Sequence, residues 1–360
     1  KYKLKAKVLD VNNNTITEAT FAPSRKNTER EALRLLYEST NGDHWKDTTN
    51  WLTSAHISEW YGVRDVSELN PQYINQQLKD HIFPSFYTGS EELVNYINLD
   101  NNNLTGDAIV SGFSFLEVLN IGNNNLNSLT IKDCAVTSPF ILDGFANLKL
   151  KELNLSDIYF STNEEIPRAL AIRSLNDNRE ESPIYIEKVN ISDIKQNNIT
   201  TRIYNLISDE VNVSDCSIKY FHLHKGEISS IITKNINNNK GNFGIDSCSV
   251  NSVDISDCSG SVSLHDLSSC DKATIKNVQE HIHVSGSVKT LDISDCTGDF
   301  IGLNLKSCNE ATIKNVQQEL INVDGSVKTL DISDCTGGGL VDLDLNSCNE
   351  ATIKNVQQEH

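Results

Sequence analysis

Apolar residues recur along most of this chain at a spacing of three and then two positions, with polar residues between them. In the segment VNYINLDNNNLTG, residues 94–106, the apolar positions are Val94, Ile97 and Leu99, and Asn102 follows after a further three. Two apolar residues separated by one polar residue share one face of a short strand. A polar residue at the fourth position is expected to satisfy backbone groups that the following bend leaves unpaired. The pattern therefore predicts short strands, each with one buried face.

The C-terminal third contains this pattern in nearly identical copies. The string SVKTLDISDCTG occupies residues 287–298 and again 326–337, and SCNEATIKNVQQE occupies residues 307–319 and 347–359. Each double unit holds two related halves of roughly twenty residues, in the range of short solenoid repeats. One such coil cannot bury its apolar face alone, so coils must stack and share a core. We therefore expect one solenoid of about a dozen coils over residues 94–360.

The segment before the repeats, residues 28–93, is different. Thr28 and Glu31 have the spacing of a helix capping box ahead of an apolar helical pattern. All three tryptophans follow it, at positions 45, 51 and 60. This segment predicts an aromatic-rich cap that covers the first coil, with a Trp-lined ligand site as the alternative. Residues 1–27 begin with alternating apolar and polar positions and predict a leading strand or linker.

The template LxxLxLxxN resembles the leucine-rich-repeat family over roughly residues 94–360. The order TNG at 40–42, three tryptophans and WYGV at 60–63 is similar to the N-terminal cap of surface and secreted members, particularly gut Bacteroidetes-type bacterial ones. The resemblance implies an α/β fold, a right-handed solenoid (a horseshoe or a flattened β-rich variant) with a helical N-terminal cap. The coils are short for the family, so segments between the template strands, such as IGLNLKSC at 301–308, are expected to be strands.

One interval between coils is longer than the others. Leu153 and Val189 occupy equivalent template positions 36 residues apart, which indicates an insertion near residues 161–188. Within it, EEIPRALAIRSLNDN at 164–178 has a helical pattern with Pro167 near its start. A helix on the convex side is the expected outcome, and a functional insertion is the alternative.

Charge excludes several classes of partner. The chain has 31 Lys and Arg against 49 Asp and Glu, a formal net charge of −18. An acidic surface disfavours nucleic acid and anionic membrane surfaces. No apolar run approaches the roughly 20 residues of a membrane span. The chain opens at Lys1 without a signal-peptide pattern, which is typical of a mature or trimmed chain. We expect neither nucleic-acid binding nor membrane insertion.

Sequence motifs of catalysis are not found. The chain lacks GxSxG, HExxH and GxxxxGK[ST], so we expect no enzyme, no catalytic residue and no cofactor. His222 and His224, like His281 and His283, point the same way on a strand, but spacing places no carboxylate or Cys beside them, so no metal site is predicted.

The nine cysteines are expected to be buried and unpaired. Six of them occupy two template positions, and equivalent cysteines are two coils apart. Two strand separations are roughly 9–10 Å, whereas a disulfide needs Cα atoms within about 7 Å. Cysteine here is expected to behave as a small buried hydrophobe.

Candidate binding residues come from the outward-facing template positions of the N-terminal coils. Five of these positions are asparagine, namely Asn98, Asn120, Asn154, Asn190 and Asn212. Their polar neighbours are Tyr96, Asp100, Glu152, Lys188 and Glu210. A row of amides either forms a ladder of mutual hydrogen bonds or binds peptide backbone or sugar hydroxyls, and both readings stay open. In the C-terminal coils these positions alternate Asp–Ser with Thr–Lys, which favours a self-neutralising scaffold.

The family resemblance implies a function in extracellular recognition. The expected protein is secreted or on a bacterial cell surface and binds a protein or glycan through a solenoid face, in adhesion or host contact. A structural spacer that displays another module is the alternative. Charge reversal along the asparagine row would be tolerated by a spacer and not by a receptor.

Overall fold

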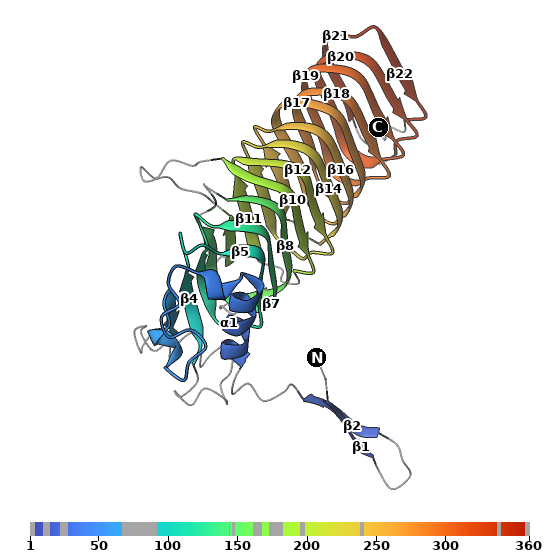
Figure 1. Cartoon of the computed structure of the whole chain (residues 1–360). Helices are drawn as coiled ribbons and strands as arrows, with labels where there is room; N and C mark the ends of the chain where they lie inside the picture. Colours follow the sequence, from blue (N-terminus) through green and yellow to red (C-terminus); the bar gives the residue numbers. More distant parts are fainter. Residues whose placement is uncertain are drawn as a thin grey trace.

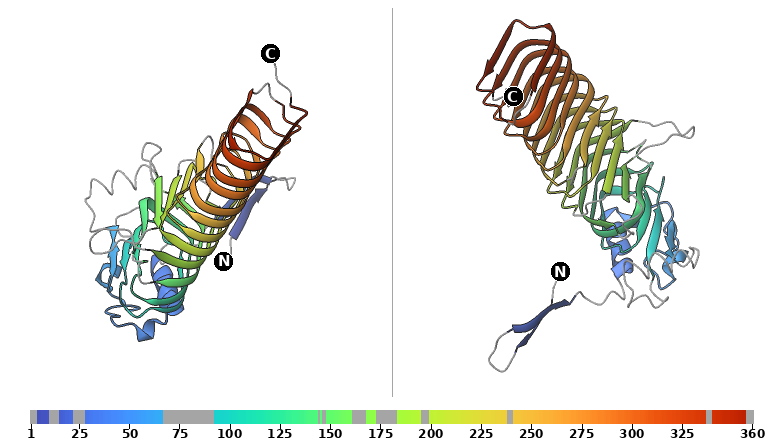
Figure 2. Two further views of the ribbon diagram at one scale, coloured as in Figure 1. Left: turned by 90° about the horizontal axis from the view of Figure 1, so that it is seen from above. Right: turned by 180° about the vertical axis from the view of Figure 1, so that it is seen from behind.

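The computed structural model describes residues 4–9, 15–21, 28–66, 92–143, 145, 148–160, 168–172, 183–194, 199–237, 241–336 and 340–356. The described residues between 94 and 356 form a parallel β-solenoid of about eleven turns. Figures 1 and 2 show the strands stacked in chain order, from the cap-proximal end to the C-terminal end. Strands β1 (Leu4–Leu9) and β2 (Thr15–Phe21) pair antiparallel as a separate hairpin, where the sequence indicated only one strand.

Each turn contributes one strand to each of two faces. Face A contains β4 (Val94–Asn98), β6 (Leu116–Asn120), β9 (Arg168–Ile172), β11 (Ile199–Tyr204), β13 (Tyr220–His224), β15 (Asn242–Asp246) and β21 (Leu340–Ser347). Face B contains β5 (Thr105–Ser111), β8 (Lys149–Phe160), β10 (Ile184–Ser192), β12 (Leu206–Ser214), β14 (Glu227–Ile236), β16 (Ser249–Cys258) and β22 (Glu350–Lys354).

Five long strands bend around a corner and belong to both faces. They are β7 (Asn125–Asp143), β17 (Ser261–Val278), β18 (Ile282–Ser294), β19 (Thr297–Lys314) and β20 (Gln317–Ser333). The segment at 301–308 lies within β19, so the expectation of strands between the template segments is confirmed. Among the described residues of the solenoid there is no α-helix, and the α/β class applies only through the N-terminal segment.

The core runs between the faces as one continuous apolar cluster. In-register pairing places like residues above one another, as in the row Ile255, Ile275, Ile293, Ile313 and Ile332. All five side chains are fully buried. Burial of one such side chain contributes about 1.5–3 kcal/mol, and the stack repeats that contribution at every turn.

From β7 onward, an Asp or Asn in the left-handed conformation lies at or near the end of the face-B segment of each turn. These positions are Asp133, Asp157, Asp193, Asp215, Asn235, Asp257, Asn277, Asp295, Asn315, Asp334 and Asn355, with φ between 50° and 57°. Asparagine and aspartate tolerate this conformation better than other residues with a Cβ. Neighbouring turns are joined there, as where Asn277 Nδ2 donates to Asp257 Oδ1 at 2.7 Å. The Asp or Asn that recurs just before the template Cys or Val is thus explained by the left-handed backbone conformation at that position.

The template Asn and Cys occupy the bends as expected. Asn124 Nδ2 donates to the carbonyl oxygens of Leu99, Ile121 and Gly122. Cys296 takes the equivalent role on face B, where its Sγ lies 3.0 Å from the carbonyl oxygen of Ser294. Both residue types therefore satisfy backbone groups that the bend leaves outside the strand ladder.

The N-terminal segment packs against the first turns. Helix α1 (Thr28–Ser39) begins at the capping-box threonine, and 3-10 turns η2 (Gly42–His44) and η3 (Ile57–Glu59) and the short strand β3 (Val63–Asp65) follow. Trp45, Trp51 and Trp60 are all at most 6% exposed, and their indole nitrogens donate to backbone carbonyls. The tryptophans are core residues, as expected, and do not line a ligand site. The expected helical cap is only partly helical, because α1 is its single described α-helix.

The helical pattern expected over 164–178 is wrong where the structure describes it. Residues 168–172 form β9, which lies between β7 and β11 on face A. Backbone pairing on both sides stabilises a strand there more than local propensity stabilises a helix. Residues 161–167 and 173–182 lie outside the described residues.

Candidate functional site

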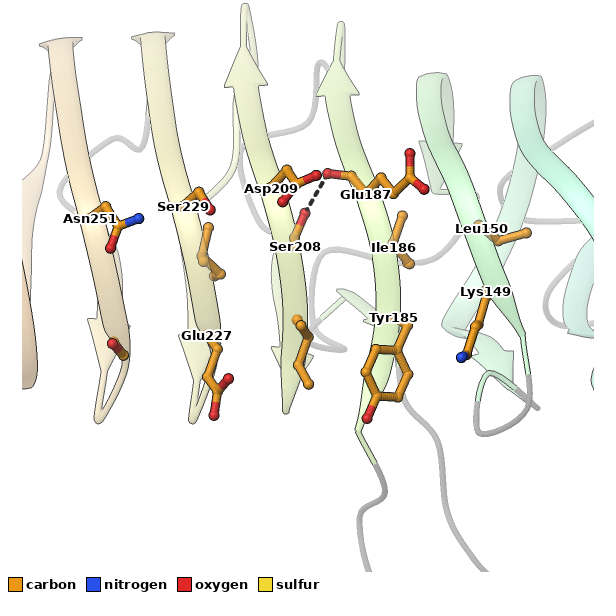
Figure 3. Close-up of a pocket in the computed structure, with 13 residues that line it drawn as sticks. Lys149, Leu150, Tyr185, Ile186, Glu187, Ser208, Asp209, Glu227, Ser229 and Asn251 are labelled. Atoms are coloured by element: carbon orange, nitrogen blue, oxygen red, sulfur yellow. Dashed lines mark hydrogen bonds between the residues drawn. The ribbon is translucent and has the colours of Figure 1, made fainter.

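A shallow groove of about 540 Å³ follows the corner at which the strands of face B begin. It crosses β8, β10, β12, β14 and β16 (Figure 3). Buried Leu150, Ile186, Ser208 and Ile228 form its floor. The groove therefore runs along the solenoid axis, with one rung every 4.7–4.9 Å, the separation of neighbouring strands.

Two rows of side chains border this floor. One row, in register across successive turns, is Lys149, Tyr185, Ile207, Glu227 and Ser249. The other row is Glu187, Asp209, Ser229 and Asn251. Both flanking positions face outward because side chains alternate along a strand, and the chain bends just after the second of them, where Glu187 and Lys188 are both exposed. Ser208 Oγ stabilises this bend by donating to the carbonyl oxygen of Glu187 at 3.1 Å.

The first of these rows departs from the repeat. In the later turns the same position is serine every time, at Ser249, Ser269, Ser287, Ser307, Ser326 and Ser347. Ser249 and Ser269 hydrogen-bond each other there, with 2.8 Å between their Oγ atoms. A lysine, a tyrosine, an isoleucine and a glutamate replace serine in the earlier turns. Comparing this position between repeats would have pointed to the groove from sequence alone, and the sequence analysis did not make that comparison.

Tyr185 is the most informative residue of the groove. Its side chain is 40% exposed, and Lys149 Nζ lies 5.6 Å from the ring centroid. An exposed ring held by a cation presents an apolar face with a polar edge, the arrangement that favours binding of an amphipathic ligand. Glu187, Asp209 and Glu227 supply carboxylate acceptors on either side.

Six of the ten predicted binding residues lie together beside the groove. They are Glu152, Lys188 and Glu210 in one row and Asn154, Asn190 and Asn212 in the next, on β8, β10 and β12. Asn190 Nδ2 donates to Asn154 Oδ1 at 2.8 Å and to Glu152 Oε1 at 3.0 Å. Of the two readings of the amide row, the ladder is formed at one step, between Asn154 of β8 and Asn190 of β10. The half-buried amides keep further hydrogen-bonding capacity facing outward.

The other four predicted residues lie on face A, at the first two turns. Asn98 and Asn120 are aligned with each other and accept from the backbone N–H two residues ahead, that of Asp100 and that of Gly122. Tyr96 lies under the guanidinium of Arg64, at 4.8 Å. The two asparagines stabilise local turns in this part of the solenoid, and Asp100 Oδ1 accepts from Asn123 Nδ2 of the next turn at 2.8 Å.

The single row of five asparagines expected from sequence is therefore two rows on different faces. Register aligns Asn154 with Thr130 of β7, whereas Asn120 aligns with Asp143. Both faces need two alternating inward apolar residues, so the template LxL occurs on each. Apolar spacing alone does not distinguish one face from the other.

In the C-terminal turns, face B has the expected alternation. Asp254, Thr274, Asp292, Thr312, Asp331 and Thr352 are in register, as are Ser256, Lys276, Ser294, Lys314, Ser333 and Lys354. Lys276 pairs with the bend residue Asp295 at 3.3 Å, rather than with the Asp row. Exposed pairs of this kind contribute little to stability.

His222, His224, His265 and His283 lie on face A, on strands β13, β17 and β18. His224 Nδ1 lies 2.8 Å from Asp246 Oδ2, and the rings of His265 and His283 are 4.6 Å apart. The carboxylate that the sequence did not place beside His224 is thus supplied by the next turn. His281 lies apart from this cluster, at the corner where β18 begins.

Acid is expected to destabilise this face. Burial, and then the positive charge of Arg202, lowers the pKa of His222, and burial followed by His265 lowers the pKa of His283. A lowered folded-state pKa contributes stability that is complete above the unfolded value of about 6.5 and is lost as pH falls through the folded value. Urea unfolding between pH 8 and pH 5 should show this loss.

The matched variant for this test is His283→Asn, which installs the residue that Asn322 supplies two rungs later. It should reduce the loss of stability below pH 6.5. The exposed His44→Asn should not change it. An unchanged slope in His283→Asn would contradict the assignment.

The nine cysteines are free, and eight of them are buried. Cys258 is aligned with Val278, so equivalent cysteines are separated by an intervening turn as expected. Burial raises the pKa of the Cys134 and Cys258 thiols to about 12 and that of Cys296 to about 11. These thiols remain protonated and unreactive at neutral pH.

Among the described residues, no helix combines the length and the apolar character that crossing a membrane requires. Comparisons with protein-family models, curated proteins and solved structures found no match to this chain.

Proposed function

We propose that this protein is an extracellular recognition protein of the leucine-rich-repeat type, secreted or displayed on a bacterial surface, with the groove on face B as its binding site. Its proposed ligand is a protein or glycan, and the lining of the groove favours an extended glycan. The observation that supports this most is the departure of Lys149, Tyr185, Ile207 and Glu227 from the serine that the later turns have.

The departure from serine is informative because the later turns show what the fold itself needs at this position. A serine row is sufficient for the solenoid itself, because six later turns stack with it. An exposed tyrosine and a half-buried isoleucine in its place add apolar surface that the fold does not require. Side chains of this kind, clustered beside acceptors in a concave region, are typical of a binding site.

The chemistry of the lining suits a sugar chain. A tyrosine ring packs against the apolar face of a pyranose, while carboxylates and amides hydrogen-bond its hydroxyls. Glu187 and Asp209 lie on the wall opposite Tyr185, and Asn251 continues that wall towards the C-terminal turns. The groove is open along the solenoid axis, so successive sugars would contact successive turns.

Replacing Tyr185 with serine, the repeat's own residue, should abolish most glycan binding. Loss of a stacked aromatic ring is expected to weaken affinity at least tenfold, because buried aromatic anchors dominate binding free energy. The measurement is a screen of the full chain against mucin glycans, bacterial surface polysaccharides and extracellular-matrix proteins. Any hit is then titrated with the variant.

Tyr220→Ser is the matched control. Tyr220 is 37% exposed and carries Lys219 at 5.4 Å from its ring, so it has the environment of Tyr185 but lies on face A. Binding lost in both variants, or in neither, would contradict the groove as the site. A protein hit lost only in Tyr185→Ser would keep the groove and change the ligand class.

The second candidate function is a structural spacer. The self-paired Asn154–Asn190 amides and the alternating C-terminal rows favour it, because such surfaces need no partner. A spacer should show no hit in the screen and tolerate Asn154→Lys together with Asn190→Lys. Binding that these substitutions abolish in a folded protein would exclude it.

A further inference from the structure

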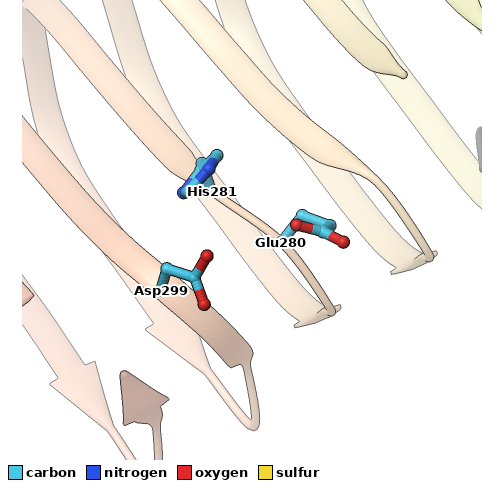
Figure 4. Close-up of side chains that lie close together, drawn as sticks. All are labelled: Glu280, His281 and Asp299. Carbon is cyan, nitrogen blue, oxygen red and sulfur yellow. The ribbon is translucent and has the colours of Figure 1, made fainter. Parts of the chain in front are cut away.

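Three side chains of metal-ligating type lie together away from the groove, at the corner where face A begins in the C-terminal turns. Donor atoms of Glu280, His281 and Asp299 all lie within 4.8 Å of one another. Figure 4 shows the His281 ring and the two carboxylates converging from two neighbouring turns. Among the described residues this is the one group of three or more such donors that meets this distance.

The backbones of these two turns approach closely at a glycine. Gly298 has φ of +145°, and a Cβ at this position would lie 2.6 Å from the carbonyl oxygen of Glu280. Only glycine allows this approach, since any other side chain would overlap the preceding turn. The next residue is Asp299, so the close contact places its carboxylate beside Glu280 and His281.

The three donors occur once, within a part of the chain that is otherwise duplicated. The string CTG at 296–298 recurs at 335–337, but the next residue, Asp299 in the first copy, is Gly338 in the second. Likewise VQEHI at 278–282 corresponds to VQQELI at 316–321, where Glu319 keeps the glutamate and Leu320 stands in place of the histidine, whereas VQQEH at 356–360 has both Glu359 and His360. The duplicated framework therefore does not itself require His281 and Asp299, just as it does not require the groove residues.

We propose that Glu280, His281 and Asp299 bind a divalent transition-metal ion, with Zn²⁺ as the best fit. One imidazole and two carboxylates are a donor set that Zn²⁺ accepts, and a site with three protein ligands leaves one position for water or a partner's group. The two carboxylates neutralise the charge of the ion. An all-oxygen ion such as Ca²⁺ or Mg²⁺ gains nothing from the imidazole.

Binding needs only a small movement of the side chains. Metal–ligand distances of about 2.0–2.2 Å place two ligands on a tetrahedral ion roughly 3.3 Å apart. The donors must close by at most about 1.5 Å from their present separation of up to 4.8 Å, which rotation about side-chain bonds supplies because His281 and Asp299 are exposed. The cost of ordering these side chains limits the affinity to that of an adaptable surface site.

The test is calorimetric titration of the full chain with Zn²⁺ in a buffer that does not bind metal. We expect one Zn²⁺ per chain, and at least a tenfold loss of affinity in His281→Ala and in Asp299→Gly, which installs the repeat's own residue. His265→Ala is the matched control, because His265 belongs to the separate histidine pair on face A. It should keep wild-type binding.

Circular dichroism and imidazole NMR signals complete the test. Far-ultraviolet spectra establish that each variant is folded, and the His281 ring resonances should shift on addition of Zn²⁺ without a change in those of His44. No saturable binding by a folded wild-type chain would overturn the proposal. Binding that survives His281→Ala and disappears in His265→Ala would also overturn it and assign the ion to the histidine pair.

Discussion

Gly325→Ala is expected to destabilise the solenoid by about 2–5 kcal/mol, the sum of a left-handed backbone cost and an overpacking cost. Gly325 has φ of +106°, and an added Cβ would lie 2.1 Å from the carbonyl oxygen of Leu305 in the preceding turn. That carbonyl belongs to the parallel ladder, so it cannot move without loosening the strand pairing at the corner. Gly286 has the same conformation and the same close approach, to the carbonyl oxygen of Leu267.

Gly112→Ala separates the two causes. Gly112 also has positive φ, at +88°, but nothing lies within 4 Å of the Cβ that alanine would add. The Gly112→Ala variant should lose only the cost of the left-handed backbone, about 1–2 kcal/mol of its free energy of unfolding. Urea unfolding gives the comparison, and hydrogen exchange locates the damage because repeat arrays open locally. Equal losses at Gly325 and Gly112 would contradict the steric argument.

Trp51→Ala is expected to cost about 3–5 kcal/mol, the range for deleting a buried aromatic side chain. Trp51 is 5% exposed and lies at the centre of the aromatic cluster. Its ring centroid is 4.8 Å from that of Trp45, 5.3 Å from that of Trp60 and 5.8 Å from that of Tyr37. Its removal leaves a cavity and frees the indole's carbonyl partner at Tyr61.

The loss should extend beyond the aromatic cluster. The aromatic cluster and the first turns of the solenoid share one apolar core. In addition, the backbone N–H of Ile109 in β5 donates to Ser39 Oγ at the end of α1. Loosening the cluster should therefore raise hydrogen-exchange rates in β4 and β5 and leave β19 unchanged. Tyr61→Ala is the control, because that side chain is 38% exposed. If Trp51→Ala leaves β4 and β5 as protected as before, the segment does not stabilise the solenoid end.

Short-range pattern was enough to predict the repeated strand and its burial. The positions of Ile293, Cys296 and Ile313 recur in near-identical strings, and each is buried as the spacing required. Helix α1 and the buried tryptophans were predictable for the same reason, since capping and aromatic composition act within a few residues. The pattern failed at residues 168–172, where local helical propensity lost to pairing on both sides with β7 and β11.

The candidate site was predictable only in part. Glu152, Lys188 and Glu210 could be placed in one row because they occupy the same template position in neighbouring coils. The division of the asparagines between two faces could not, because both faces have the same alternation. Tyr185 and Glu227 were missed because they lie one residue before the first apolar residue of the template, Ile186 and Ile228, at a corner that periodicity does not describe.

The sequence by itself determined that the chain is a stack of short strands, which side chains of each strand are buried, and that its cysteines are unpaired. These properties depend on alternation and spacing along the chain, which are local. Only the tertiary structure decided which turns face each other, and with that the groove, the histidine cluster and the meeting of Glu280 with Asp299. Those features depend on register between strands some twenty residues apart, and register is set by the closure of each turn and the packing of the shared core.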